Sequence, residues 1–303
     1  MNDLVIHKKR NSLIELYRFL FAFNVIIGHG LFPIDIPYFG PDRISVEFFF
    51  ILSGYLFAFS LEKYRKMPLK YAVRTMLASK IKPLLVPLII GLVSNAILNY
   101  ITGYNPLKLF RYLWYIPAMI IAFLIFIVLR FLIKSNKKFW STVAAILVLS
   151  VLLRFSGSEL LFFFDYLRSV LAISLGMLLT KIPSFSKRKW VCWVVLVLVA
   201  ITIFVIVFLG LARDSKFYEA LLDIVLYPIL ICVTFNVNCN LHIFNYLGGL
   251  SFGMYAFQCP ARLLLVTVYV NPWIPFVLIF VLALIDDAAK RIIKHQKCKA
   301  IGG

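Results

Sequence analysis

The chain has 303 residues, of which 62% are hydrophobic and 15% are charged. Soluble domains are about half apolar and about a quarter charged, so this composition excludes an ordinary soluble protein. We expect a single all-α domain over residues 1–303, built from membrane-spanning helices and surrounded by membrane lipids. The five cysteines are scattered and form no C-x-x-C pair, so neither a disulfide framework nor a metal site is indicated.

Apolar stretches of about twenty residues recur along the whole chain. Each is long enough to cross a bilayer core of about 30 Å at about 1.5 Å per helical residue. Prolines at 33, 37, 41 and 272 mark places between these stretches where a helix cannot continue. The pattern predicts ten helices, at residues 13–32, 44–62, 82–100, 112–133, 139–154, 163–180, 190–211, 218–237, 247–268 and 272–289.

The positive charges are unevenly divided between the two sides of this arrangement. Most of the 32 lysines and arginines fall in the loops and tails that share a side with both termini. Short cytoplasmic loops are enriched in Lys and Arg, so the distribution predicts that both termini are cytoplasmic. It also accounts for most of the net charge of +19 without a nucleic-acid partner.

The first predicted helix carries three ionisable side chains in an apolar stretch, ELYRFLFAFNVIIGHG at residues 15–30. Arg18 and His29 are eleven residues apart, so they lie on nearly the same helix face, about 16 Å apart along the axis. Glu15 lies one turn before Arg18 and can pair with it. A charge at bilayer depth costs at least about 2.5 kcal/mol, so such residues are functional candidates. The alternatives are an arginine that reaches the inner headgroups and a hydrogen-bonded histidine at the outer interface.

The second predicted helix adds one carboxylate, Glu47, to the apolar run ISVEFFFILSGYLF at residues 44–57. Because the first two helices run in opposite directions, Glu47 and His29 come to nearly the same depth in a core of about 30 Å. We therefore hypothesise that Glu47 hydrogen-bonds His29 and orients it as a base. The alternative is a carboxylate in the outer headgroup layer, paired with Arg43.

Other charged residues in the predicted helices are expected to form local ion pairs. Asp286 and Asp287 lie one turn before Lys290 and Arg291 at the inner end of the last helix. This spacing favours two pairs between residues four positions apart. Asp165 is expected to pair with Arg168, three positions later, at the start of the sixth helix, and the alternative role is to line a substrate groove.

Four short motifs follow one another in the chain, each of them in a predicted helix or beside one. They are Arg18 and His29 with Glu15 before them; Ser45-Val46-Glu47-Phe48-Phe49 with Ser53-Gly54-Tyr55; LWYIPAM with Trp114 and Tyr115; and LGGLSFGMYAFQCP with Gly248, Ser251, Phe252, Tyr255 and Pro260. Together they resemble the acyltransferase-3 family, membrane-bound acyltransferases that modify bacterial surface glycans. The resemblance spans residues 12–262.

The chain departs from the family pattern at two places. Where the family often has an Arg-x-x-Arg pair, taken to grip the phosphates of coenzyme A, this chain has Lys80 and Lys82 with Arg74 upstream. Lysine supplies positive charge to a phosphate but not the bidentate fork of arginine. Gln258 stands where the family has a late histidine, and glutamine can hydrogen-bond but cannot titrate.

The resemblance implies a transfer reaction across a bacterial inner membrane. Family members move an acyl group, usually acetyl, from cytoplasmic acetyl-CoA to a hydroxyl of a glycan or glycolipid that faces outside. By that analogy His29 is a general base or an acyl relay, supported by Glu47 and Arg18. The donor phosphates are assigned to Arg18, Arg74, Lys80 and Lys82. The substrate-binding candidates are Glu15, Trp114, Tyr115, Ser251, Tyr255 and Gln258.

Other readings of the same residues stay open. The aromatic candidates also suit ordinary packing or an interfacial belt, and serines at 53 and 251 also suit helix contacts. A transporter or flippase is the main alternative function, with the buried ionisable groups lining its pathway. A structural partner in a glycan-assembly complex, without catalysis, is another. A transporter moves its substrate without consuming acetyl-CoA, which separates it from an acyltransferase.

Overall fold

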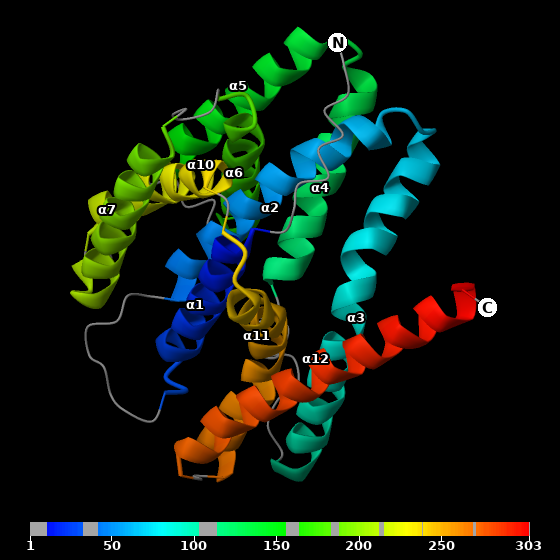
Figure 1. The fold of residues 1–303 in the computed structure, drawn as a ribbon, viewed down its shortest axis with the longest axis vertical. Coiled ribbons are helices and arrows are strands. Elements are labelled where there is room, and N and C mark those ends of the chain that lie inside the picture. Colours follow the sequence, from blue (N-terminus) through cyan, green and yellow to red (C-terminus); the bar gives the residue numbers. More distant parts are fainter. Residues whose placement is uncertain are drawn as a thin grey trace.

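The computed structural model describes residues 11–32, 42–102, 114–155, 164–182, 188–211, 215–237, 239–268 and 271–302. Every regular element in these ranges is a helix, which confirms the predicted all-α fold (Figure 1). A π-helical turn, η3 (Leu222–Leu226), joins α9 to α10. The α-helices are α1 (Ser12–Gly28), α2 (Asp42–Tyr64), α3 (Leu69–Thr102), α4 (Tyr115–Leu132), α5 (Asn136–Phe155), α6 (Phe164–Leu179), α7 (Lys189–Phe208), α9 (Lys216–Leu221), α10 (Tyr227–Asn236), α11 (His242–Val268) and α12 (Trp273–Gly302).

Two helices run well past the ends that their apolar stretches predict. α3 begins at Leu69 rather than at residue 82, and α12 continues to Gly302 rather than ending at residue 289. Charged residues between 70 and 82 favour a loop when hydropathy alone is considered, but lysine and arginine are good helix formers. The predicted loop at 69–81 is therefore wrong, and Lys80 and Lys82 lie on one continuous helix.

Five helical segments in the described ranges are long and apolar enough to cross a membrane. They are Ile44–Tyr64, Tyr115–Leu132, Asn136–Leu153, Lys189–Phe208 and Phe217–Asn236. A further apolar helix, Tyr166–Leu179, is shorter. The segments support a multi-pass membrane protein. The predicted number of ten spans and the cytoplasmic placement of both termini stay predictions.

The helices pack most closely where glycine removes a side chain. At the crossing of α2 and α6, a Cβ on Gly54 would overlap the carbonyl oxygen of Ile173, and a Cβ on Gly176 would overlap that of Ile51. Small residues allow such close backbone contact between membrane helices. α1 packs against both α2 and α11, and α11 also packs against α3 and α12 (Figure 1). Helices from the two ends of the chain thus meet around α1.

The two predicted ion pairs of α12 are confirmed. Lys290 Nζ donates to Asp286 Oδ2, and Arg291 Nε donates to Asp287 Oδ2 at 2.7 Å. Asp286 is buried where α12 packs on α11, and a Cβ on Gly253 would lie 3.5 Å from its Oδ2. The charged end of α12 is therefore part of a helix contact.

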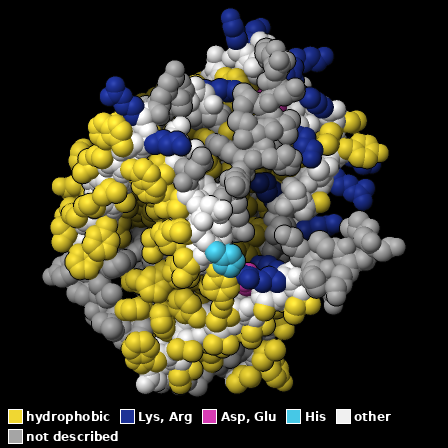
Figure 2. Space-filling view, in the orientation of Figure 1, with side chains coloured by type: hydrophobic (Ala, Val, Ile, Leu, Met, Phe, Trp, Pro, Cys, Tyr) yellow, Lys and Arg dark blue, Asp and Glu magenta, His cyan; other side chains and the backbone are white. Residues whose placement is uncertain are grey.

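The surface separates apolar from basic side chains. In Figure 2, hydrophobic side chains cover the left and lower parts of the molecule, and lysine and arginine gather along the upper and right-hand edges. α7 contributes several exposed apolar side chains, Trp193, Val197, Ile201, Phe204 and Phe208. Broad exposed apolar faces of this kind suit contact with lipid.

Candidate active site

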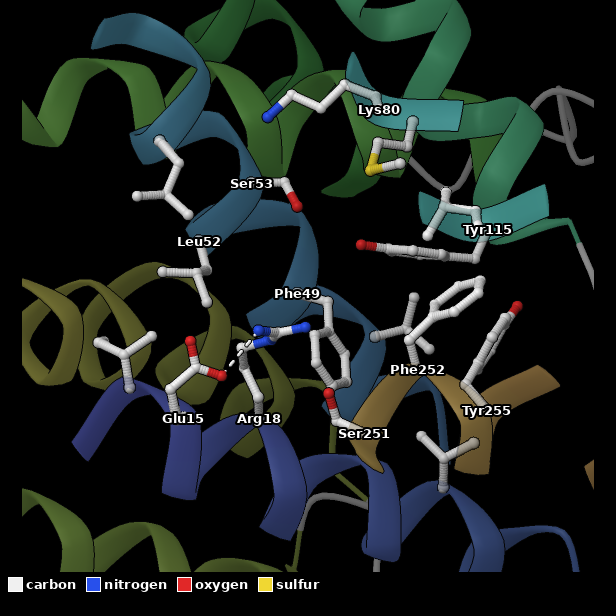
Figure 3. Close-up of a pocket in the computed structure, with 16 residues that line it drawn as sticks. Glu15, Arg18, Phe49, Leu52, Ser53, Lys80, Tyr115, Ser251, Phe252 and Tyr255 are labelled. Carbon is white, nitrogen blue, oxygen red and sulfur yellow. Dashed lines mark hydrogen bonds and ion pairs between the residues drawn. The ribbon is translucent and has the colours of Figure 1, made fainter. Parts of the chain in front are cut away.

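Helices α1, α2, α3, α4 and α11 border a cavity of about 310 Å³ (Figure 3). This volume lies at the lower end of the range for small-molecule sites. The wall is mostly apolar and carries a few polar side chains, all but one of which belong to the predicted binding residues. The polar lining residues are Glu15, Arg18, Ser53, Lys80, Tyr115, Ser251 and Tyr255.

α1 presents an ion pair to the cavity. Arg18 Nη1 donates to Glu15 Oε2 at 2.8 Å, which confirms the predicted pairing (Figure 3). α11 holds Glu15 in place, because a Cβ on Gly248 would overlap the Glu15 side chain. The Glu15 side chain is 9% exposed, whereas that of Arg18 is 32% exposed. The guanidinium therefore faces the cavity, and one of its nitrogens, Nη1, is hydrogen-bonded to Glu15.

Lys80 reaches the same cavity from α3, on the side opposite Glu15 and Arg18 (Figure 3). Its ammonium lies 5.7 Å from the centre of the Phe123 ring, and it has no carboxylate partner in the described part of the chain. Lys80 precedes the apolar stretch of α3, and burial lowers the pKa of its ammonium below that of an ordinary lysine. Two cations and one carboxylate give the cavity lining a net positive charge, which favours an anionic ligand.

Aromatic rings form the other side of the cavity. Tyr115 of α4 shares a hydrogen bond with Ser53 of α2, and its ring centroid lies 5.7 Å from that of Tyr255 on α11. Phe50 packs against the Tyr115 ring at 4.5 Å.

The Ser251 hydroxyl donates to Gly248 O, one turn back in α11, at 2.8 Å. This bond is usual for a helical serine and does not activate it as a nucleophile.

Glu47 does not line the cavity, and its predicted hydrogen bond to His29 is wrong. Glu47 Oε1 accepts a hydrogen bond from Arg168 Nε at 2.6 Å, and both side chains are buried. Arg168 comes from α6, which crosses α2 closely. A guanidinium can neutralise a buried carboxylate, whereas a neutral imidazole cannot, so Arg168 is the stronger partner. The side chains of Arg43 and Asp165, which we also expected in ion pairs, lie outside the described residues.

His29 follows α1 directly and precedes Gly30, which has a φ of +69° that glycine adopts without strain. Its Nδ1 lies 3.4 Å from Nη1 of Arg262 on α11. A guanidinium only donates, so a neutral His29 in this contact accepts at Nδ1 and carries its proton on Nε2. The sequence motifs do not include Arg262. The sequence feature that could have identified Arg262 is that it is the one charged residue in the predicted helix 247–268.

The predicted phosphate-binding residues of α3 are divided between two faces of the helix. Residues two positions apart on a helix are related by a rotation of about 200° around its axis, so their side chains point in nearly opposite directions. Lys80 faces the cavity, whereas Lys82 is exposed and lines a separate shallow hollow together with Arg74. The continuous helix separates residues that a loop could have brought together.

Trp114 and Gln258 lie beside the cavity wall and do not line it. Trp114 directly precedes α4, and its ring centroid is 5.8 Å from that of Phe50. Gln258 lies one turn beyond Tyr255 on α11 and is 1% exposed. Across the described ranges there is no group of three or more His, Cys, Asp or Glu side chains that could hold a metal ion.

The fold and the cavity define a class of protein, a multi-pass helical membrane protein with a cationic and partly aromatic cavity between its helices. A protein-family model described as an acyltransferase domain matches residues 11–285. The chain therefore belongs to the acyltransferase-3 family of membrane acyltransferases, which confirms the resemblance of its motifs. A search of curated proteins and a search of solved structures gave no significant match.

Proposed function

We propose that the protein transfers an acyl group, usually acetyl, from cytoplasmic acyl-CoA to a hydroxyl of a glycan or glycolipid on the other side of a bacterial inner membrane. Family membership supports acyl transfer in general. The observation that carries the donor assignment is the cavity where Arg18 and Lys80 border a mostly apolar space. Coenzyme A has the complementary build, with phosphates at one end and a neutral arm at the other.

The cations of α1 and α3 are assigned to the donor in two groups. Exposed Arg74 and Lys82 attract the polyanionic donor, an effect that weakens as salt screens the charges. Lys80 and Arg18 hold the part of the donor that reaches the cavity. The excess of lysine and arginine in the predicted inner loops supports a cytoplasmic approach. The neutral arm then extends along α1 toward His29.

His29 is the proposed base for the acceptor. Its imidazole removes the hydroxyl proton as the oxygen attacks the thioester carbonyl. The tetrahedral intermediate then expels the coenzyme A thiolate, which takes the proton from the imidazolium, so the products are an ester and a free thiol. In the second route the imidazole first takes the acyl group and then passes it to the hydroxyl. Both routes use the lone pair of an unprotonated ring nitrogen, so at Nδ1 the substrate must replace Arg262 as the hydrogen-bond partner.

The test is the consumption of labelled acetyl-CoA by the purified full chain in lipid nanodiscs. We expect His29→Ala to lower turnover by about 10²–10⁴-fold, the range for a well-placed general base. Arg18→Ala should raise the KM for acetyl-CoA. His242→Ala, at the exposed start of α11, is the matched histidine control and should retain activity. Equal turnover in wild type, His29→Ala and Arg18→Ala would overturn the site assignment.

The same preparation separates the alternative functions. A transporter or flippase would carry a labelled glycolipid across a vesicle membrane and leave acetyl-CoA intact. A structural partner without catalysis would do neither. Either outcome with well-folded wild-type protein would replace the proposed acyl transfer.

A further inference from the structure

α1 and α11 lie side by side, run in the same direction and keep one register along their contact. Near the start of α1, Glu15 packs against Gly248. At the end of α1, His29 meets Arg262. Both contacts join residues that are 233 positions apart in the chain. The two helices therefore form a continuous seam from the cavity to His29.

Gln258 belongs to the face of α11 that forms this seam. Ser251 and Tyr255 line the cavity, and Arg262 is the neighbour of the proposed base. At about 100° per residue, positions 251, 255, 258 and 262 fall within about 60° of one another around the helix. Gln258 therefore lies between the cavity and the proposed base, level with Val25 of α1, which lines the cavity.

The amide of Gln258 has no hydrogen bond. The residue is 1% exposed, and neither its Oε1 nor its Nε2 has a partner among the residues that the structure describes. Burying an amide in this state is unfavourable, because the group loses its bonds to water and gains none. The adjacent side chains of Phe257 and Ala261 are buried and apolar. The amide therefore keeps a donor group and an acceptor for a ligand.

We propose that Gln258 binds the amide groups of a substrate, with Oε1 accepting from the N–H of one secondary amide and Nε2 donating to the carbonyl of a neighbouring group. The proposal rests on the proposed acyl transfer and names how a substrate is held between the cavity and His29. Two substrates carry such a group: the pantetheine arm of acyl-CoA has two secondary amides, and an acetamido sugar has one. The position favours the donor, since its arm must pass Gln258 on the way from Arg18 to His29.

The proposal accounts for a glutamine at the position where the family motif has histidine. Glutamine cannot carry a proton through a reaction, so an acid or base role at position 258 is not available. Its carbonyl and amino groups point the same way, so they can contact the N–H of one amide and the carbonyl of the next group along an extended arm. The two nitrogens of an imidazole point apart and cannot do so.

The first experiment compares acetyl donors with and without amides, using the full chain in nanodiscs. The donors are acetyl-CoA, S-acetylpantetheine, which keeps both amides, and S-ethyl thioacetate, which has none. We expect Gln258→Met to lower kcat/KM by about tenfold to a hundredfold for the first two donors, with S-ethyl thioacetate unchanged. Leu264→Met, a conservative change on a face of α11 about 120° from Gln258, is the control and should change none of them.

A second measurement needs only the wild-type protein, in case Gln258→Met does not fold. S-acetyl-N-acetylcysteamine carries one secondary amide, and its N-methyl analogue lacks the N–H. We expect N-methylation to lower kcat/KM by about tenfold, because Oε1 of Gln258 then loses its donor. Where Gln258→Met does fold, the two thioesters should react equally well with it.

The acceptor arm of the experiment decides which substrate supplies the amide. Paired acceptors that differ only in an acetamido group or a hydroxyl are compared at saturating acetyl-CoA. If Gln258→Met loses its preference between these acceptors and keeps wild-type behaviour with every donor, the bound amide is the acceptor's. An equal loss with all donors and acceptors, or no loss with any, overturns the amide site while leaving the proposed acyl transfer intact. Wild-type protein that consumes no thioester overturns both.

Discussion

Glu47 with Arg168 and Glu15 with Arg18 are both carboxylate–guanidinium pairs, but their surroundings differ. The first pair joins α2 to α6, and its side chains are 1% and 6% exposed. The second lies within α1, where Glu15 is 9% exposed and Arg18 is 32% exposed. Protein encloses the first pair, whereas the second faces a cavity that also holds a second cation.

The difference separates a structural role from a binding role. The closed pair is buried away from the cavity, and the buried Asp223 also attracts Arg168, so removal of the pair should affect the fold. In the open pair the guanidinium keeps donors for a ligand, so its removal should affect substrate affinity. From hydropathy alone the two pairs look the same, since both are charged residues in apolar stretches.

The largest expected effect is on the closed pair. Arg168→Leu leaves the buried Glu47 carboxylate without a cation, which should lower the free energy of unfolding by about 3–5 kcal/mol. Thermal and denaturant unfolding of the purified protein in nanodiscs measures the loss. The double variant Glu47→Gln with Arg168→Leu removes the orphaned charge and should recover part of it.

Arg291→Leu is the matched control for this prediction. Its partner is Asp287, the Arg291 side chain is 54% exposed, and pairs of this kind contribute less than about 1 kcal/mol. If Arg168→Leu proves as stable as Arg291→Leu, the closed pair has no structural role.

The open pair should behave in the opposite way. Arg18→Leu is expected to lower kcat/KM for acetyl-CoA by about tenfold to a hundredfold, as a charged hydrogen bond of about 1.5–3 kcal/mol is lost. The free energy of unfolding should fall less than in Arg168→Leu, because the Arg18 side chain is 32% exposed and water reaches this pair. Turnover and unfolding are measured on the same preparation. A large loss of stability with unchanged kcat/KM would reverse the assignment of the two pairs.

A smaller effect is expected where α11 supports the open pair. Gly248→Ala places a methyl group against Glu15 and should cost about 1–3 kcal/mol of stability, with a rise in the KM for acetyl-CoA as Arg18 shifts. Gly249→Ala is the matched control, because its Cβ would meet only the carboxylate tip of Asp287, at 3.0 Å. Equal behaviour of the two alanine variants would show that the α1–α11 contact tolerates a side chain.

The smallest expected effect is a change in pH dependence at Lys80. Burial lowers its pKa from the ordinary value of about 10.4, so its positive charge is lost at a lower pH than that of an exposed lysine. We expect kcat/KM for acetyl-CoA to fall as pH rises through this lowered pKa. Lys80→Arg keeps its proton and should move the fall to higher pH, whereas exposed Lys66→Arg should leave the profile unchanged. An identical profile in Lys80→Arg would separate Lys80 from donor binding.

Features that depend on local spacing could be predicted from the sequence. Helices follow from apolar stretches, and the pairs of Glu15 with Arg18 and of Asp286 with Lys290 follow from residues one turn apart. These interactions need no knowledge of how the helices are arranged. They are therefore present whenever the local helix forms.

Features that depend on helix arrangement could not be predicted in this way. Glu47 and Arg168 are 121 residues apart, and their contact requires that α6 cross α2. The similar predicted depth of His29 and Glu47 was not enough to identify the partner of Glu47, because depth does not specify the direction in which a side chain points around its helix. The separation of Lys80 from Lys82 was missed for a related reason, since it appears only when residues 69–81 are helical.

The length of α3 has a mechanical consequence for the donor site. Its 34 residues measure about 51 Å, against about 30 Å for the hydrocarbon layer, so the helix must tilt or stand clear of it. Removing four residues before Lys80 would shorten the first part of α3 by about 6 Å and would leave the direction of the Lys80 side chain unchanged. Removing one residue between Lys80 and Leu84 would rotate the Lys80 side chain by about 100° around the helix axis, so that its ammonium no longer pointed into the cavity. The rotational position of Lys80 around the α3 axis, more than the length of α3, thus decides whether its ammonium can contact the proposed donor.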